Sequence, residues 1–313
     1  MTTPIIDARD VAVDYTSGPP WDQRVTNAIK TVTISIAPGE TLGLVGESGS
    51  GKTTLGRLFL GLVAPSAGSV QFDGEPIGPR RKPPRGQLSI VLQQPEWALN
   101  PRLKVATSVA EPLSILGRMS AAERLAEVRR SLELVGLDAS FAARYPHELS
   151  GGQRQRVSIA RALITEPRFI VFDEAVSALD VSVQTQVLNL IKDLQSEHNF
   201  SALFISHDLA ATRYVSHRMA VMYAGELMEV GPADLFYAKP QHPYSRALGV
   251  SISLKDADVF KLRGTVADVS PVGCPLNLRC PWSIDRCRTD KPVLRGLGEG
   301  LIACHRAEEV AAA

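Results

Sequence analysis

A glycine-rich segment that follows a short apolar run near the start of the chain constrains the fold most. Residues 41–45 read Thr-Leu-Gly-Leu-Val, which predicts a buried strand, and a helix is expected over residues 52–61. Between them, residues 46–53 match the pattern G-x-x-x-x-G-K-[ST]. A strand, a tight loop and a helix in this order direct backbone N–H groups and a helix N-terminus at one point, where they bind phosphate oxygens. The segment therefore predicts an α/β fold that binds a nucleotide.

The residues of this loop have distinct expected roles. Lys52 is expected to reach the β- and γ-phosphates of ATP, and the Thr53 hydroxyl is expected to bind Mg²⁺. The other positions expected to contact ATP are Gly46, Ser48, Gly49, Ser50, Gly51 and Thr54. A short glycine motif alone leaves a second interpretation open, namely a tight turn that binds no nucleotide.

The overall charge balance gives no indication of a nucleic-acid partner. The chain of 313 residues carries 34 Lys and Arg against 33 Asp and Glu, a formal net charge of +1, whereas nucleic-acid-binding domains carry a basic patch. No apolar run approaches the roughly 18 residues that suggest a membrane span, and the first residues lack the pattern of a secretory signal. We therefore expect a protein that folds in the cytosol and reaches a membrane only through other polypeptides.

Strand and helix patterns alternate along most of the chain. Apolar strand patterns at 169–172, 202–205 and 219–223 follow helical patterns, which predicts βαβ units and a sheet covered on both faces. Segment 100–148 differs, because apolar residues recur there at helical spacing after a capping-box pattern that begins at Ser120. We interpret it as a helical insertion. Further strands are expected over residues 5–15, 31–37, 69–72 and 87–92.

Two adjacent carboxylates end the apolar strand pattern of residues 169–172. Successive side chains of a strand point in opposite directions, so Asp173 and Glu174 can serve different purposes. Asp173 can hold the Mg²⁺ shell while Glu174 polarises an attacking water. Two surface acids at a strand end are the simpler alternative, but the nearby phosphate loop favours a catalytic pair.

Residues 149–156, Leu-Ser-Gly-Gly-Gln-Arg-Gln-Arg, form a second anion-binding pattern. Ser150 lies where the N-cap of a helix is expected, and the two glycines leave backbone N–H groups uncovered at its positive end. One nucleotide cannot easily use two distant anion sites of the same chain. We therefore expect a two-chain sandwich in which this pattern faces the nucleotide of the partner. Its members are Ser150, Gly151, Gly152 and Gln153.

These motifs, in this order, resemble the nucleotide-binding subunit of an ATP-binding cassette (ABC) transporter over residues 5–250. The implied fold is a P-loop NTPase of the ABC cassette class, with a RecA-like core, an antiparallel β subdomain and a helical subdomain over about residues 100–165. The cassette is expected to fill residues 1–250. A small Cys-rich C-terminal extension is expected over residues 251–313.

The resemblance assigns a role to the remaining motif residues. Gln93 matches the Q-loop glutamine, which senses Mg²⁺ together with Thr53 and Asp173. Tyr15 matches the aromatic residue that stacks on adenine, and Asp180 matches the aspartate of the D-loop. The residues implied to be catalytic are Glu174, His207 and Lys52.

Two further segments resemble the oligopeptide and dipeptide importers. Residues 241–248 resemble their His-Pro-Tyr segment, and residues 99–102 resemble the segment after their Q-loop. Residues 173–180 are closer to the second of the two ATPases in those systems, with Ala175 where many relatives have proline. The resemblance implies an ATPase on the cytoplasmic face of the inner membrane that energises import of peptides or a related small solute. Its implied partners are a second ABC ATPase, two transmembrane permease subunits and an extracytoplasmic substrate-binding protein.

Four cysteines lie near the C-terminal end, and disulfides are not expected in the cytosol. Their spacing lacks the paired C-x₂-C of common zinc ribbons. Four thiolates can bind a [4Fe–4S] cluster or a structural Zn²⁺, or they can remain free thiols. The importer family has a similar cysteine-bearing tail, which favours the iron–sulfur cluster. The expected ligands are Cys274, Cys280, Cys287 and Cys304.

A soluble ABC ATPase that acts on nucleic acid or ribosomes is the alternative function. Those relatives usually join two cassettes in one chain or insert long coiled coils between the motifs. This chain has one cassette, no long insertion and no basic arm. The sequence therefore favours the importer subunit.

Overall fold

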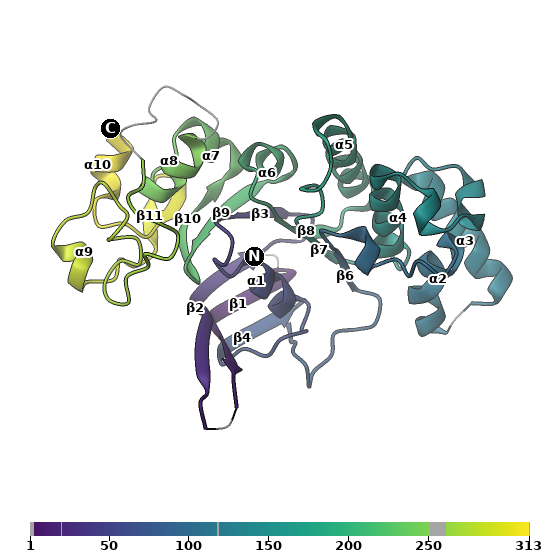
Figure 1. Ribbon diagram of the computed structural model, residues 1–313, viewed down its shortest axis with the longest axis horizontal. Helices are drawn as coiled ribbons and strands as arrows, with labels where there is room; N and C mark the ends of the chain where they lie inside the picture. Colours follow the sequence, from purple (N-terminus) through teal and green to yellow (C-terminus); the bar gives the residue numbers. More distant parts are fainter. Residues whose placement is uncertain (1–2, 20, 118, 251–260, 313) are drawn as a thin grey trace.

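The computed structural model describes residues 3–19, 21–117, 119–250 and 261–312. Strands form the centre of the molecule, with a group of helices at one end and the C-terminal region at the other (Figure 1). The predicted domain boundary at residue 250 lies beside residues 251–260, outside the described residues, and it stays a prediction.

Parallel strands form the part of the sheet that carries the phosphate loop. Their order is β9 (Arg218–Tyr223), β3 (Thr41–Val45), β8 (Ser201–Ile205), β7 (Phe169–Asp173) and β6 (Leu88–Val91). A further strand, β10 (Glu226–Pro232), pairs antiparallel with β9. Strand β3 is central and buried at every position, as expected of a parallel strand covered on both faces.

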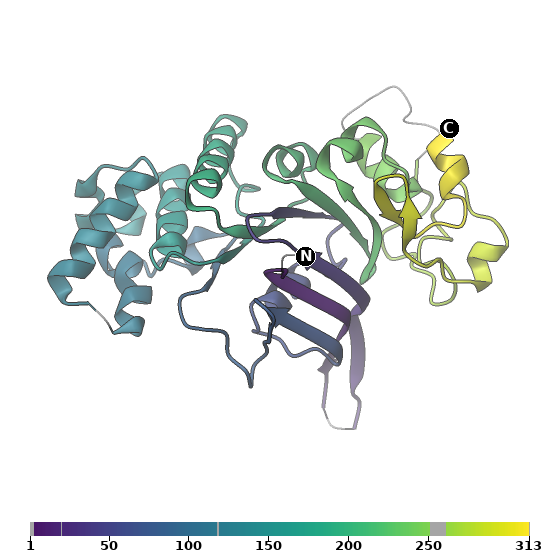
Figure 2. The same cartoon turned by 180° about the vertical axis from the view of Figure 1, so that it is seen from behind.

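An antiparallel group of strands precedes and follows the phosphate loop in sequence. It consists of β1 (Ile6–Ser17), β2 (Arg24–Ile36), β4 (Ala67–Phe72) and β5 (Glu75–Pro76). The sequence pattern predicts the second strand only from residue 31, but β2 begins at Arg24, because its pairing with β1 continues to Ser17. The resulting hairpin projects from the body of the molecule in both ribbon views (Figure 1 and Figure 2).

Alternate residues of the parallel strands face two separate apolar clusters. The helices that cover the sheet are α1 (Lys52–Phe59), α4 (Gly151–Leu163), α5 (Val181–His198) and α6 (Leu209–Val215). In β7, Phe169 and Val171 pack with α1 and the antiparallel strands, whereas Ile170 and Phe172 pack with α4 and α5. This period-two alternation confirms the prediction of a sheet covered on both faces.

The helical group begins after β6, the strand that precedes Gln93, and it ends with α4. Its other elements are η1 (Pro95–Trp97), α2 (Val105–Leu116), α3 (Ala121–Leu134), η2 (Ala139–Ala143) and η3 (Pro146–Glu148). Capping boxes open both α3 and α4, because the Ser120 and Ser150 hydroxyls accept from the backbone N–H groups three residues later. Both helix starts were predicted from the sequence, and both are confirmed.

The C-terminal region is joined to the sheet rather than separate from it. Its elements are α7 (Ala233–Ala238), α8 (Pro243–Val250), α9 (Arg286–Thr289), β11 (Arg295–Leu297), β12 (Gly300–Ile302) and α10 (Ala307–Ala312). Strand β12 pairs antiparallel with β10, and the region lies at the end of the molecule opposite the helical group (Figure 2). None of the helices in the described part of the chain is long and apolar enough to cross a membrane.

Replacement of a β3 core residue should destabilise the fold strongly. Leu42 is fully buried in the cluster that contains α1, so we expect Leu42→Ala to lower the free energy of unfolding by about 2–5 kcal/mol. Leu62 is 63% exposed, and Leu62→Ala should change it by no more than about 0.5 kcal/mol. Urea unfolding followed by circular dichroism measures both. Equal effects of the two changes would contradict the assigned core.

Candidate nucleotide-binding site

The segments that follow four neighbouring parallel strands meet at one edge of the sheet. The strand order β3, β8, β7 and β6 places side by side the loops that follow each of them. Because the carboxyl ends of parallel strands open onto one edge, α/β proteins bind ligands there. At or just after the strand ends, in the same order, come Lys52, His207, Asp173 with Glu174, and Gln93.

Close backbone contacts explain two glycines of the phosphate loop. A Cβ atom at Gly46 would lie 2.1 Å from the carbonyl oxygen of Met222, and one at Gly51 would lie 2.5 Å from that of Ala28. Their φ angles of 155° and 104° also favour glycine. Within the loop, Ser48 is exposed, and the buried Ser50 Oγ has no hydrogen-bond partner among the described residues.

Lys52 is buried at the start of α1 and is held by the loop itself. Its Nζ donates to the Gly46 carbonyl at 2.7 Å and to the Glu47 carbonyl at 2.9 Å. Burial lowers the pKa of Lys52, while the carboxylates of Glu174 and Asp173 oppose this shift. A phosphate oxygen would compete with the two carbonyls for this ammonium group.

The side chains of Thr53 at the start of α1 and Asp173 at the end of β7 contact each other. The Thr53 hydroxyl donates to Asp173 Oδ1 at 3.1 Å. Burial raises the pKa of Asp173, and the hydrogen bond from Thr53 opposes the rise. A hydroxyl and one carboxylate fit Mg²⁺, which proteins bind through one or two carboxylates together with substrate phosphates.

The Glu174 carboxylate lies beside His207. Its backbone N–H donates to Ile205 O at 2.9 Å, and its φ of 49° lies in the left-handed region that non-glycine residues rarely adopt. Glu174 Oε2 lies 3.4 Å from His207 Nδ1, and the His207 side chain is 63% exposed. The two carboxylates thus contact different neighbours, because β7 ends at Asp173 and Glu174 follows it in the left-handed conformation rather than as a further strand residue.

Three further residues that the sequence predicts for the nucleotide site contact other protein groups or are partly exposed. Gln93 Nε2 donates to Ser177 Oγ at 3.3 Å, and that hydroxyl donates to the Glu174 carbonyl at 2.9 Å. Asp180 is the N-cap of α5 and accepts from Val183 N at 3.0 Å. Tyr15 lies in β1 and is 39% exposed. The roles of Gln93, Asp180 and Tyr15 stay predictions.

The Ser-Gly-Gly-Gln pattern lies at the exposed N-terminus of α4. Ser150 Oγ accepts from Gln153 N, and Gln153 Oε1 accepts from Ser150 N at 3.0 Å. Helix α4 packs with α2, α3 and α5, whereas α1 packs with the antiparallel strands and with β7 and β8. The two anion-binding patterns therefore belong to different parts of the chain, and the role of the second toward a partner stays a prediction.

The four C-terminal cysteines do not form a ready metal site. Cys274, Cys280 and Cys287 are buried in one apolar cluster, and Cys304 is half-buried. Burial raises the pKa of the Cys274 and Cys280 thiols to about 12. In the described part of the chain, no group of three or more His, Cys, Asp or Glu side chains is arranged to hold a metal ion. The expected iron–sulfur cluster is thus not supported by the structure.

Sequence reasoning missed a group of residues that surrounds Glu47 of the phosphate loop. Arg279 Nη1 and Nη2 donate to the two Glu47 carboxylate oxygens at 2.7 and 2.9 Å, and Glu47 N donates to Tyr244 Oη at 3.0 Å. Tyr244 belongs to the His-Pro-Tyr segment, and Arg279 precedes Cys280. Both segments resemble segments of the importer family, but no local sequence pattern predicts that either of them contacts residue 47.

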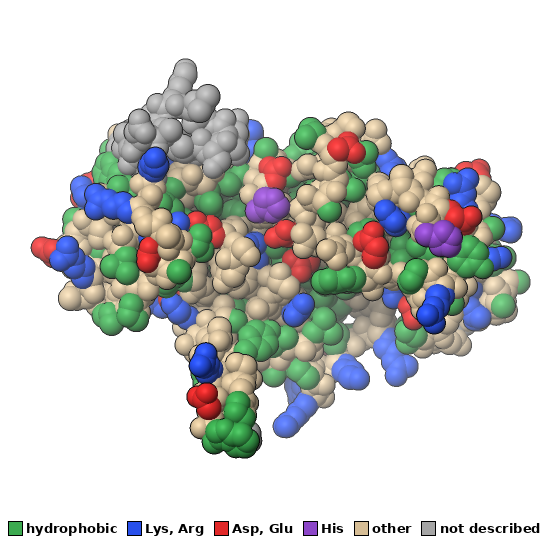
Figure 3. All heavy atoms as spheres, viewed as in Figure 1, with side chains coloured by type: hydrophobic (Ala, Val, Ile, Leu, Met, Phe, Trp, Pro, Cys, Tyr) green, Lys and Arg blue, Asp and Glu red, His purple; other side chains and the backbone are tan. Residues whose placement is uncertain are grey.

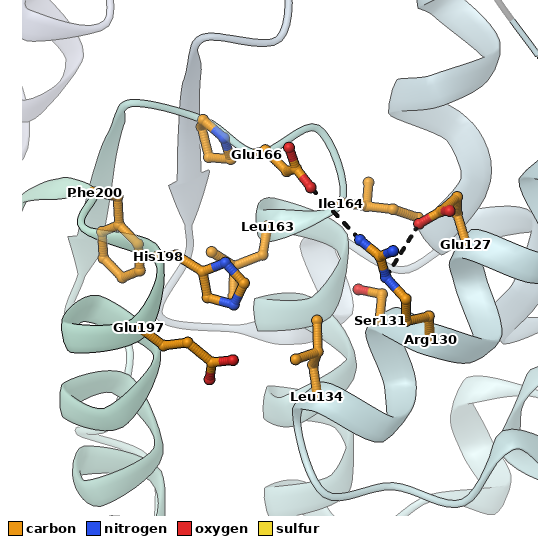
Figure 4. A pocket seen from close by; sticks show the side chains of 11 residues that line it. Glu127, Arg130, Ser131, Leu134, Leu163, Ile164, Glu166, Glu197, His198 and Phe200 are labelled. Carbon is orange, nitrogen blue, oxygen red and sulfur yellow. Dashed lines mark ion pairs between the residues drawn. The ribbon is translucent and has the colours of Figure 1, made fainter.

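One cavity of about 330 Å³ lies away from this edge, between α3 and the end of α5 (Figure 4). Arg130 forms ion pairs there with Glu127 at 3.5 Å and Glu166 at 3.6 Å. None of the predicted nucleotide-site residues lines this cavity. On the face drawn in Figure 3, acidic and basic side chains are interspersed over the upper part, and several Lys and Arg side chains lie together along the lower edge beside the hairpin.

The sheet order, the phosphate loop and the carboxylate pair define a P-loop ATPase of the cassette class. A family model described as ABC transporter matches residues 29–177, and one described as oligopeptide/dipeptide transporter, C-terminal region, matches residues 228–287. A Brucella abortus protein is 47% identical over 312 residues, which cover 96% of this chain and 93% of that protein. The chain therefore belongs to the ABC transporter family and is an ATPase of that family.

Named relatives and solved structures agree on this family. The Brucella abortus protein carries the provisional name of peptide import ATP-binding protein, as does a Brucella ovis protein that is 44% identical over 95% of this chain and 96% of its own. A dimeric ATP-binding cassette with ADP and phosphate bound has a TM-score of 0.64 at 30% identity, over 73% of this chain and 98% of its own. A Clostridium perfringens protein that is part of an ABC transporter complex has a TM-score of 0.66 at 25% identity, over 80% of this chain and 96% of its own.

Proposed function

We propose that this ATPase energises the import of peptides or a related small solute through a membrane complex. The observation that carries the proposal is the edge of the sheet where Thr53 meets Asp173 and Glu174 meets His207. The match of residues 228–287 to the C-terminal region of oligopeptide/dipeptide transporters supports the peptide substrate. The provisional names of the relatives support it as well.

The proposed mechanism assigns one task to each group at this edge. Lys52 leaves the two loop carbonyls and neutralises phosphate oxygens, and Glu174 orients the attacking water and takes its proton. His207 steadies the γ-phosphate from the neighbouring strand. Thr53 and Asp173 would hold Mg²⁺, which would supply positive charge to offset the phosphates.

A second cassette completes the site in this proposal. The exposed Ser150 end of α4 would face the nucleotide of the partner, and closure of the sandwich would move two permease subunits through the Gln93 segment and the helical group. A sister ATPase is the proposed second cassette, and an extracytoplasmic binding protein delivers the solute. The chain would work at the cytoplasmic face of the inner membrane as a peripheral subunit.

The role of Glu174 can be tested by a nearly isosteric change. Glu174→Gln removes the base but keeps the volume, so we expect ATP binding to persist while hydrolysis falls by about 10²–10⁴-fold. Phosphate release and ATP titration of the same preparation measure the two quantities. Exposed Glu75 of β5 provides a matched control, since Glu75→Gln should alter neither. Normal turnover in Glu174→Gln would refute the assigned role.

The membrane partner can be tested by isolating the full chain from its native membranes. An importer ATPase should retain integral membrane proteins through mild-detergent purification, and mass spectrometry should identify a second cassette beside them. Recovery of the chain with ribosomes or nucleic acid instead would favour the alternative soluble ATPase. Nuclease treatment and high salt serve as controls, because they disrupt nucleic-acid contacts but leave an apolar subunit interface intact.

We also propose that the four cysteines bind a [4Fe–4S] cluster of structural or redox-sensing use. The proposal rests on the resemblance of this tail to the cysteine-bearing tail of the importer family; in the structure, three of the thiols lie in one apolar cluster, and the backbone N–H of Arg306 donates to Cys304 Sγ at 3.4 Å. Since no metal-ready group exists among the described residues, the thiols would have to move closer together on binding.

Anaerobic purification followed by absorbance and iron analysis tests the cluster. We expect a brown protein with about four iron atoms per chain, and a loss of iron in Cys274→Ser. Zinc in place of iron would support a structural Zn²⁺ site. A colourless, metal-free protein with full ATPase activity would overturn the cluster proposal.

A further inference from the structure

We infer that Arg279 of the C-terminal region is a positioning residue for nucleotide binding, which acts through Glu47 on the phosphate loop. The inference rests on the proposed nucleotide site and adds to it a residue outside the cassette motifs. Arg279 is 5% exposed and forms a two-pronged pair with the Glu47 carboxylate. This geometry fixes both the direction and the distance of the carboxylate.

Glu47 is held by its side chain and by both ends of its backbone. Its N–H donates to the fully buried Tyr244 hydroxyl, and its carbonyl accepts from Lys52 Nζ and from Ser50 N. Two of these attachments, Arg279 and Tyr244, come from beyond the sheet core. The C-terminal region thus holds Glu47 by its side chain and its N–H, whereas Lys52 contacts only its carbonyl.

The aromatic residues beneath the ion pair make it rigid. Tyr223 and Tyr244 pack edge to face with ring centroids 4.8 Å apart, and the Arg279 guanidinium lies 5.7 Å from the Tyr223 ring centre. Arg279 Nη1 also donates to the Tyr223 hydroxyl at 3.4 Å. A guanidinium confined in this way cannot follow the carboxylate if the loop moves, so it resists displacement of residue 47.

The Arg279–Glu47 ion pair is better suited to fixing the shape of the phosphate loop than to stabilising the fold. Removing two charges from water costs about as much as their attraction returns, so a buried ion pair is weak evidence of net stabilisation. The fork geometry does, however, select one arrangement of the loop. When a nucleotide takes Lys52 from the carbonyls of Gly46 and Glu47, the Arg279 pair keeps the loop in its binding shape. Loss of the pair should therefore weaken binding.

The test compares two tail arginines that each pair with a glutamate through two nitrogen atoms. Arg295 pairs with Glu308 at 2.6 and 2.7 Å on the surface, away from the phosphate loop. Titration calorimetry with Mg-ADP on the full chain should show a Kd raised about tenfold in Arg279→Met, as is typical when a partner that orients a binding group is lost. Arg295→Met should leave Kd within about twofold.

Steady-state hydrolysis and a conservative variant separate positioning from mere folding. Arg279→Met should raise KM for ATP with little change in kcat, the pattern of lost uniform binding. Arg279→Lys keeps the charge but not the fork, so it should fold and show an intermediate Kd. The double change Glu47→Gln with Arg279→Met should cost no more than Arg279→Met alone, because both act through one contact.

The outcomes distinguish this inference from the proposed function. An unchanged Kd in folded Arg279→Met and Arg279→Lys, beside a strong loss of binding in Lys52→Ala, would overturn the inference and leave the nucleotide site standing. A lower melting temperature with unchanged Kd would also overturn it, since it would show a structural role only. Unchanged binding in Lys52→Ala would refute the nucleotide site itself.

Discussion

The parallel pairing of β3 with β8 and of β8 with β7 is the constraint on which the site depends. Each pairing is in register over at least four residues, so the strand ends lie side by side. The phosphate loop, His207 and the carboxylate pair follow those ends directly. Residues far apart in sequence therefore reach one another without a long loop, and a change of register in β8 would move His207 away from Glu174.

The same pairing explains why two adjacent carboxylates have different environments. Asp173 is the last residue of β7 and pairs in register with Ile205, which leaves its side chain beside Thr53. Glu174 follows in a left-handed conformation, with its N–H still bonded to the Ile205 carbonyl. Such strain persists only when surrounding contacts enforce it, and it is frequent at functional sites. The chain thus places two consecutive carboxylates beside different neighbours, Thr53 and His207, as the separate roles proposed for them require.

Elements that depend on neighbouring residues in the sequence, such as β3 and the helix N-caps, could be predicted from the sequence. Strand β3 was predicted at its observed bounds, and the N-caps Ser120 and Ser150 were predicted because their partners lie three residues away. The early start of β2 was not predicted, because polar residues from Arg24 onward pair with β1 in a hairpin that buries little. Strand β12 was missed too, since three residues are too few to show a strand pattern, and their pairing with β11 and β10 comes only with the fold.

The contact between Arg279 and Glu47 could not be predicted from the sequence at all. Its partners are 232 positions apart, and neither residue differs locally from a solvated charge. Only the packing of one apolar cluster, which joins Val45 at the end of β3 to the buried cysteines of the C-terminal region, brings the two charges together. Once that cluster forms, a buried guanidinium needs a carboxylate, and the phosphate loop supplies it. The loop that binds phosphate is therefore shaped from two sides, by the strand and helix that flank it in sequence and by an arginine from the opposite end of the chain.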